Sequence, residues 1–426
     1  MPEEKKDGKE RKVWTYKNFE ALLALPERLA HFLRLWFHIP KTDWDFMVAK
    51  VRQGSPYLEW SRSKGKGKGR RFFAAPCPEL MRAQRSILDR FLSSVPVHFA
   101  RHGGQVGSSI FTNAEHHAGF AKTVFAVDIV NAFPSVYRSR VRACLWKPFE
   151  FGFRQFAGVE FTPEERKAML ETVVDLLVWK DRLPQGPPTS PRVFDIVCGK
   201  MDQGLFELIQ ANSSPLQSYR LSIYADNITI SSDGAIPQEV QQEAVKIISD
   251  CGFYTHSRPD KMAYFSPETG TVPVVTGLVI LPDGRVLMHP NKVNQLRGRL
   301  TRLLRQETWD RVLRGEVAGV LGFIRQVYPF GTDKKVPSKL RKVVASAEAR
   351  LGTIPGTNSD KDIAPVIPPD GKPLTPPEEK KEKPKKKASK AKAKKSKSSK
   401  HPPGAKEMIL PLPQEAVEEV PEAVCV

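Results

Sequence analysis

The sequence has few cysteines and no long apolar segment. Its five cysteines show neither a Cys-x-x-Cys pair nor any other metal-ligand spacing, so we expect free thiols in a reducing compartment. No run of about 18 apolar residues occurs, so no transmembrane helix is expected. Residues 1–11 are charged and lack the apolar core of a signal peptide. Together these absences predict a soluble, cytoplasmic protein with no membrane partner.

Acidic residues are outnumbered. The chain has 67 lysines and arginines against 47 aspartates and glutamates, which gives a net charge of +20. Residues 380–400 alone hold twelve lysines and one glutamate, so the remainder is only modestly basic. This balance favours a polyanionic partner, although many proteins that bind no nucleic acid are equally basic outside such a run.

The composition changes sharply near residue 353. Residues 353–426 hold 13 of the 36 prolines and the whole lysine run, with few aromatic residues, which predicts a disordered tail. The preceding residues mix helical and strand patterns, and this predicts an α+β fold. Helical spacing of apolar residues marks residues 17–37, 78–92 and 292–305, and a capping box at Thr162 opens a helix expected to run to Trp179.

Two aspartates lie where predicted strands end. Residues 124–128 form a buried-strand pattern that ends in Asp128. Residues 221–230 predict a β-hairpin whose tight turn, Tyr-Ala-Asp-Asn, carries Asp226. Two such carboxylates can share a pair of divalent cations that clamp the attacking and leaving oxygens of a phosphoryl transfer. Solvated turn positions are the commoner role for aspartates at strand ends, so the pair needs support from other segments.

That support comes from the residues between and around the aspartates. Leu-Pro-Gln-Gly-Pro-Pro-Thr-Ser-Pro at 183–191 forms a rigid loop pattern before an apolar helix. Asp128, this loop and the Tyr-Ala-Asp-Asn turn, in that order, resemble motifs A, B and C of a reverse transcriptase palm. Arg-Phe-Phe-Ala-Ala-Pro at 71–76 resembles the fingers motif, and Gly-Phe at 252–253 with Lys261 resembles motif D.

Two further motifs resemble one branch of that family. Asn-Ala-Glu-His-His at 113–117 matches the Asn-Ala-x-x-His box of bacterial retron reverse transcriptases, and Val-Thr-Gly at 275–277 matches their signature before the thumb. The resemblance covers roughly residues 50–350. It implies a right-hand architecture: an N-terminal helical segment (1–49), fingers and a palm with an antiparallel sheet (50–290), a helical thumb (291–352) and the basic tail (353–426).

The resemblance also implies residue roles. Asp128 and Asp226, with Asn227 and the backbone carbonyl of Ile129, would hold two Mg²⁺ ions, or Mn²⁺ in their place. Arg71 and the lysines at 64–68 would bind the triphosphate, and Gln185 would support the incoming nucleotide. Phe133 would be a steric gate that selects deoxynucleotides, and Lys261 would donate a proton to pyrophosphate. Arg297, Arg302 and Arg305 would contact the nucleic acid. Ordinary core packing at Phe133 and ordinary solvated cations at Lys261 and on residues 292–305 are the alternatives. His117 is expected to be structural.

Asn227 departs from the family pattern of two consecutive aspartates. A carboxamide removes one negative charge but still offers a neutral oxygen, so we expect activity to survive with weaker metal affinity. The implied function is an RNA-directed DNA polymerase that uses deoxynucleoside triphosphates to copy its own structured non-coding RNA. It would prime from a 2′-hydroxyl, form a branched RNA–DNA hybrid and serve antiphage defence, with an effector protein as a possible partner.

Two alternatives remain open. The chain could be a reverse transcriptase of another branch, of the group II intron or diversity-generating type. It could also be a non-catalytic RNA-binding homologue in which Asn227 marks lost chemistry.

Overall fold

The computed structural model describes residues 19–54, 56–63, 69–156, 160–256, 262–268, 270–329 and 335–352. Its helices are α1 (Glu20–Ala24), α2 (Glu27–Phe37), α3 (Lys41–Arg52), α4 (Pro78–Arg90), the 3-10 helix η1 (Leu92–Ser94), α5 (Ile110–Glu115), α6 (Arg138–Phe153), α7 (Pro163–Leu177), α8 (Ser190–Val197), α9 (Gly199–Asn212), α10 (Gln238–Asp250), α11 (Pro290–Leu304), α12 (Arg311–Val327) and α13 (Ser338–Gly352). Its strands are β1 (Tyr57–Ser63), β2 (Arg70–Pro76), β3 (Thr123–Asp128), β4 (Tyr219–Tyr224), β5 (Asn227–Ser232), β6 (Met262–Phe265), β7 (Val274–Val275), β8 (Leu278–Ile280) and β9 (Val286–Met288). Helices combined with antiparallel sheets confirm the predicted α+β class.

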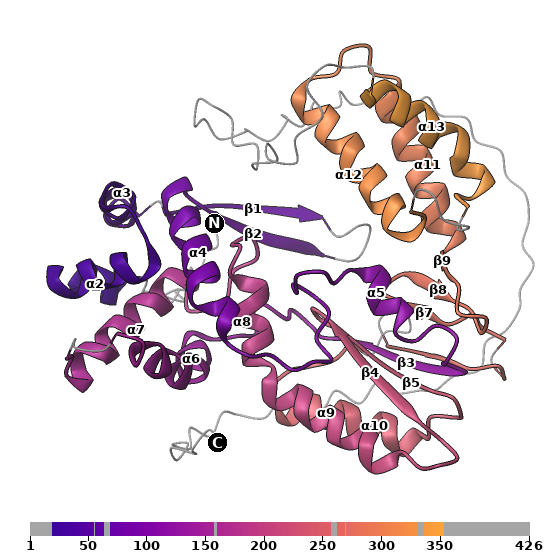
Figure 1. Cartoon of the computed structure of the whole chain (residues 1–426), viewed down its shortest axis with the longest axis horizontal. Coiled ribbons are helices and arrows are strands. Elements are labelled where there is room, and N and C mark those ends of the chain that lie inside the picture. Colours follow the sequence, from indigo (N-terminus) through magenta and orange to yellow (C-terminus); the bar gives the residue numbers. More distant parts are fainter. Residues whose placement is uncertain are drawn as a thin grey trace, which may run out of the picture. The chain divides into compact units, whose positions relative to one another are not determined.

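The central sheet has the strand order β4-β5-β3-β6, and all its pairs are antiparallel. The strand predicted to end at Asp128 is β3, and the predicted hairpin is β4 and β5. Helices α9 and α10 pack against each other, and α9 also packs on β4 (Figure 1). Strand β3 lies between β5 and β6 and is buried along nearly its whole length. Its last residue, Asp128, therefore has a fixed position where these strands end.

The N-terminal helices are separated by prolines. Pro26 and Pro40 directly precede α2 and α3, where a missing backbone N–H costs nothing at a helix start. The region predicted to form one or two short helices over 17–37 therefore folds as α1 and α2. Beyond them, β1 and β2 form a two-stranded hairpin, in the register Tyr57↔Pro76 to Ser63↔Arg70. Residues 64–68, between the two strands, lie outside the described residues.

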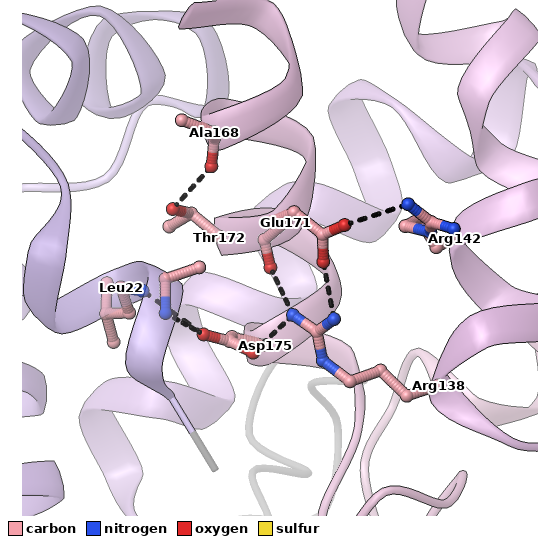
Figure 2. A network of polar contacts seen from close by, with 8 residues as sticks. Leu22, Arg138, Arg142, Ala168, Glu171, Thr172 and Asp175 are labelled. Atoms are coloured by element: carbon pink, nitrogen blue, oxygen red, sulfur yellow. Dashed lines mark hydrogen bonds and ion pairs between the residues drawn. The ribbon is translucent and has the colours of Figure 1, made fainter. Parts of the chain in front are cut away.

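A buried carboxylate attaches α1 to α7. Asp175 accepts hydrogen bonds from the backbone N–H groups of Ala21 (2.9 Å) and Leu22 (3.1 Å), and its other oxygen accepts one from Arg138 (2.8 Å) (Figure 2). The first turn of α1 thereby gains an anion for its otherwise unpaired N–H groups. The charge of Asp175 is balanced by Arg138, which also pairs with Glu171.

Helix α7 begins with the predicted capping box, in which Thr162 and Glu165 exchange hydrogen bonds. It ends at Leu177, two residues before the predicted end. The reason is a tight turn: Trp179 and Arg182 exchange backbone hydrogen bonds, and Lys180 and Asp181 between them adopt positive φ. A helix cannot continue through that backbone geometry.

A second core joins the small sheet β7-β8-β9 to α5, α11, α12 and α13. In Figure 1 the last three helices form a bundle, and α11 packs on both α12 and α13. Val293, Leu296 and Leu300 are the buried face of α11, as the helical spacing predicted. Among the described residues, no helix combines the length and the apolar character needed to cross a membrane.

Candidate active site

The two predicted carboxylates meet at one edge of the central sheet. Asp128, the last residue of β3, pairs in register with Asn227, the first residue of β5. The backbone N–H of Ile129 donates to the carbonyl oxygen of Asp226 at 3.0 Å. Asp128 is almost fully buried and Asp226 is half-buried. The hairpin turn therefore presents Asp226 and Asn227 directly beside Asp128.

The turn itself is tight and strained. Ala225 adopts a left-handed conformation (φ 54°), which is unfavourable for a residue with a Cβ atom. The Asn227 carboxamide donates to Oδ1 of Asp226 at 3.3 Å. Its nitrogen is therefore the atom next to the carboxylate, where an aspartate would bring a second negative charge.

A cavity of about 460 Å³ opens beside these residues. Asp128, Tyr224 and Asn227 form part of its wall, and Thr276 and Gly277 form another part. Of the four turn residues, Tyr224 and Asn227 line this cavity, while Ala225 and Asp226 do not. The Val-Thr-Gly segment, noted in the sequence only as a family signature, thus lies across a cavity from the strand-end carboxylate.

Helix α5, which carries the first residues of the Asn-Ala-x-x-His box, packs on the sheet β7-β8-β9, and Ala114 of the box shares a core with Val275. Thr276 donates its hydroxyl to the carbonyl oxygen of Ile110, the first residue of α5, at 3.0 Å. Gly119, just beyond the box, donates its N–H to the carbonyl oxygen of Leu281 at 3.1 Å. The two motifs that distinguish the retron branch are therefore parts of one packed unit.

His117 has the structural role that was expected. It is fully buried, and its two ring nitrogens lie 2.6 Å from the Ser231 hydroxyl and 2.7 Å from the Ser222 hydroxyl. Burial, together with His116, His102 and Arg220, holds the pKa of His117 well below its ordinary value, so the ring is neutral. A neutral imidazole has one donor and one acceptor, and it therefore bridges β4 and β5, the strands that carry the turn.

The Leu-Pro-Gln-Gly loop is fixed to the β1–β2 hairpin. The backbone N–H of Ala74 donates to the carbonyl oxygen of Gln185 at 2.8 Å. Gly186 has φ 139°, and a Cβ atom there would lie 2.4 Å from the carbonyl oxygen of Ala74. Only glycine allows the loop to approach so closely, and the contact ties half-buried Gln185 to the strand that carries exposed Arg71.

Phe133, three arginines and Lys261 complete the set of predicted residues. The Phe133 ring is half-buried, with its centroid 5.3 Å from that of Phe194. Arg297, Arg302 and Arg305 are exposed on α11 and at its end, and none forms an ion pair with a described residue. Lys261 lies outside the described residues.

One residue that the sequence did not mark is Arg101. Its side chain is fully buried, pairs with Asp195 and Asp202, and donates to the carbonyl oxygen of Ala225 in the turn. No local pattern identifies it, because its partners lie 94 to 124 residues away along the chain.

Comparison with known proteins supports the same family as the motifs. The chain is 32% identical over 276 residues to the retron Mx162 reverse transcriptase of Myxococcus xanthus. The aligned residues make up 61% of this chain and 54% of that protein. It is 26% identical over 295 residues to the retron Ec73 reverse transcriptase of Escherichia coli, which covers 67% of this chain and 87% of that protein. The chain is similar to retron reverse transcriptases over about two thirds of its length. No protein-family model matches it.

Coverage differs among these relatives of the retron-type family. The chain spans about half the length of the Mx162 protein, and 62% of the retron Mx65 reverse transcriptase of Myxococcus xanthus, to which it is 28% identical.

Proposed function

We propose that this chain is an RNA-directed DNA polymerase whose catalytic centre is the edge where β3 ends and the β4–β5 turn begins. The observation that carries the proposal is the register of Asp128 with Asn227, which puts Asp226 and Asp128 on adjoining segments beside a cavity. Phosphoryl transfer needs little covalent chemistry from a protein and depends on positioned charge.

A right-hand layout follows from the same proposal. The β1–β2 hairpin with the adjoining helices would be the fingers, the central sheet the palm, and α11 to α13 the thumb. The boundaries proposed are 1–49 for the N-terminal helices, 50–290 for fingers and palm, 291–352 for the thumb and 353–426 for the basic tail.

The oxygens at this edge suit Mg²⁺. Among the described residues, no three His, Cys, Asp or Glu side chains gather into a metal-binding cluster. The protein would supply two carboxylates, with the Asn227 carboxamide and the Ile129 carbonyl as neutral oxygens. Mg²⁺ commonly binds one or two carboxylates and takes its other ligands from water and substrate phosphates, so the donor set fits. The bound ions would stabilise the attacking and leaving oxygens.

The remaining roles rest on the resemblance to reverse transcriptases. Arg71 is exposed on β2 and would bind the triphosphate, while Gln185, on the loop bonded to that strand, would support the incoming nucleotide. Phe133 would exclude a ribose 2′-hydroxyl. Lys261 would protonate pyrophosphate. Arg297, Arg302 and Arg305 would contact the phosphates of the template–primer duplex.

The substrate and product proposed are those of the retron branch. The protein would bind a structured non-coding RNA, prime from one of its 2′-hydroxyls and produce a branched RNA–DNA hybrid, for use with an effector protein against phage. The packed unit of the Asn-Ala-x-x-His box and the Val-Thr-Gly segment supports this branch over a group II intron or diversity-generating enzyme.

A second candidate rests on Asn227. With one carboxylate fewer, the edge would attract cations less strongly, and a protein that only binds RNA would be the outcome if this loss abolished chemistry.

Two assays test the proposal. Purified protein is given an RNA template, an annealed primer, deoxynucleoside triphosphates and Mg²⁺, and the proposal predicts primer extension that chelation by EDTA abolishes. RNA binding without extension would favour the second candidate. Nucleic acid that co-purifies with the protein is then sequenced with and without RNase treatment, and DNA covalently joined to RNA would support the retron branch.

A further inference from the structure

Arg101 is a buried cation at the base of the candidate active site. Its Nε and Nη2 atoms both donate to Asp202, each at 2.7 Å, and Nη1 donates to Asp195 at 3.1 Å. The side chains of Arg101 and Asp202 are fully buried, and that of Asp195 is nearly so. A fully buried arginine is stable only when it is paired in this way, so its position is fixed by α8 and α9, which carry the two aspartates.

The same guanidinium reaches the catalytic turn. Nη1 also donates to the carbonyl oxygen of Ala225, at 3.1 Å. Ala225 is the left-handed residue directly before Asp226. A strained backbone persists only where its surroundings hold it, and this hydrogen bond fixes the peptide group that leads into Asp226.

The backbone around Arg101 follows the turn closely. Ile223 donates its N–H to the carbonyl oxygen of Ala100, and His102 donates to that of Ile223, both at 2.8 Å. A Cβ atom on Gly103 would lie 2.4 Å from the backbone nitrogen of Ala225. The segment 100–103 therefore packs against β4 and the turn with no intervening space.

Asp195 belongs to a wider polar network. Gln105 donates to it at 3.0 Å and accepts from Arg192 at 2.7 Å. Burial raises the pKa of Asp195 to about 6, whereas Asp202 holds Arg101 through two short bonds. Asp202 is thus the main counterion of Arg101.

We propose that Arg101 is a positioning residue for the metal-binding turn. It holds the Ala225 carbonyl, and through it keeps Asp226 and Asn227 beside Asp128. The proposal rests on the proposed polymerase function for its effect on activity, but the positioning of the turn is a property of the protein alone.

The test uses Arg101→Lys in the full chain. Lysine keeps the charge but cannot bond Asp202 through two atoms and reach Ala225 together. Backbone hydrogen exchange is measured by mass spectrometry on the metal-free protein, together with the Mg²⁺ dependence of primer extension. We expect faster exchange in peptides covering residues 221–230 and a severalfold higher half-saturating Mg²⁺ concentration.

Asp175→Asn is the matched control. It also perturbs an arginine–aspartate pair, between half-buried Arg138 and buried Asp175, but that pair attaches α1 to α7 (Figure 2). It should lower the melting temperature while leaving exchange in 221–230 and the Mg²⁺ requirement unchanged. Should Arg101→Lys fail to fold, Arg101→Met combined with Asp202→Asn removes the cation with its main counterion and should give the same two changes.

The outcomes separate the two proposals. A folded Arg101 variant with wild-type exchange in 221–230 and a wild-type Mg²⁺ requirement would overturn the positioning role. A wild-type protein that does not extend primers would overturn the polymerase function, and the exchange measurement would still decide the role of Arg101.

Discussion

Asn227 occupies the position where two consecutive aspartates are usual in the family that this chain resembles. Its carboxamide donates a hydrogen bond to Asp226. Because the carboxamide is neutral, the turn carries one negative charge less than a two-aspartate turn would. The neutral side chain avoids repulsion between adjacent carboxylates when no cation is bound, and it weakens attraction when one is.

Asn227→Asp should therefore act in opposite directions with and without metal. We expect a lower melting temperature in the absence of Mg²⁺, a larger stabilisation on adding it, and primer extension at least equal to that of the wild type at a lower Mg²⁺ concentration. Thermal melts and extension assays over a Mg²⁺ series measure both. Reduced extension with an unchanged Mg²⁺ requirement would mean that the amide has a specific role.

Phe133 packs its ring near that of Phe194, and we propose that the ring also discriminates between ribonucleotides and deoxynucleotides. Phe133→Val should raise the ratio of ribonucleotide to deoxynucleotide incorporation, because the smaller side chain leaves room for a 2′-hydroxyl. Phe99→Val, at a strongly exposed aromatic residue, is the control. If the Phe133 variant only loses stability and keeps its incorporation ratio, the ring serves core packing.

The positions of Asp128 and Asp226 at adjoining strand ends were predictable at the residue scale, but the buried residues behind the turn were not. Alternating residues and a tight turn predicted the hairpin, and a buried apolar run ending in Asp128 predicted the strand beside it. Arg101 and Asp202 are 101 residues apart, and nothing local distinguishes a buried arginine from the many exposed ones.

The hairpin formed by β4 and β5 is held together beneath its turn by His117. A neutral imidazole accepts from one serine and donates to the other, so its removal leaves two buried hydroxyls without their partner. Loss of such a partner costs about 1–3 kcal/mol per buried group.

His117→Ala should lower the free energy of unfolding by a few kcal/mol, whereas His116→Ala, at the exposed neighbouring ring, should change it little. The lowered pKa of His117 means that the unfolded chain binds a proton more readily than the folded protein. Stability from this site is therefore present above the ordinary pKa of 6.5 and lost as the pH falls below it. Denaturant unfolding from pH 5 to 8 measures how the free energy of unfolding depends on pH. The same dependence in the wild type and in His117→Ala would contradict the prediction.

Elements differed in how well the sequence predicted them. Long periodic segments such as α11 and the capped helix α7 were predictable. Strands β7, β8 and β9 have only two or three residues each, too few to show alternation. The cavity wall that Val274, Thr276 and Gly277 share with Asp128 therefore became evident only from the fold.

The whole chain divides its positive charge between the folded part and residues 353–426, which lie outside the described residues. Deleting 353–426 should leave primer extension intact, because no catalytic motif lies there. It should weaken RNA binding and reduce its salt dependence, since the twelve lysines at 380–400 would release counterions from phosphates. RNA affinities of the full-length and truncated proteins at two salt concentrations measure this. Identical affinities and salt slopes would instead favour a protein-docking role for the tail, through its apolar residues 408–410.

The central claim, that Asp128 and Asp226 hold the metal ions of RNA-templated DNA synthesis, is tested most directly by primer extension with Asp128→Ala and Asp226→Ala. Asp250→Ala, at an exposed carboxylate on α10, is the matched control. We predict that both active-site variants fold, as shown by wild-type circular dichroism, and that neither extends a primer at any Mg²⁺ concentration, while the control extends normally. Full extension by either active-site variant would contradict the account.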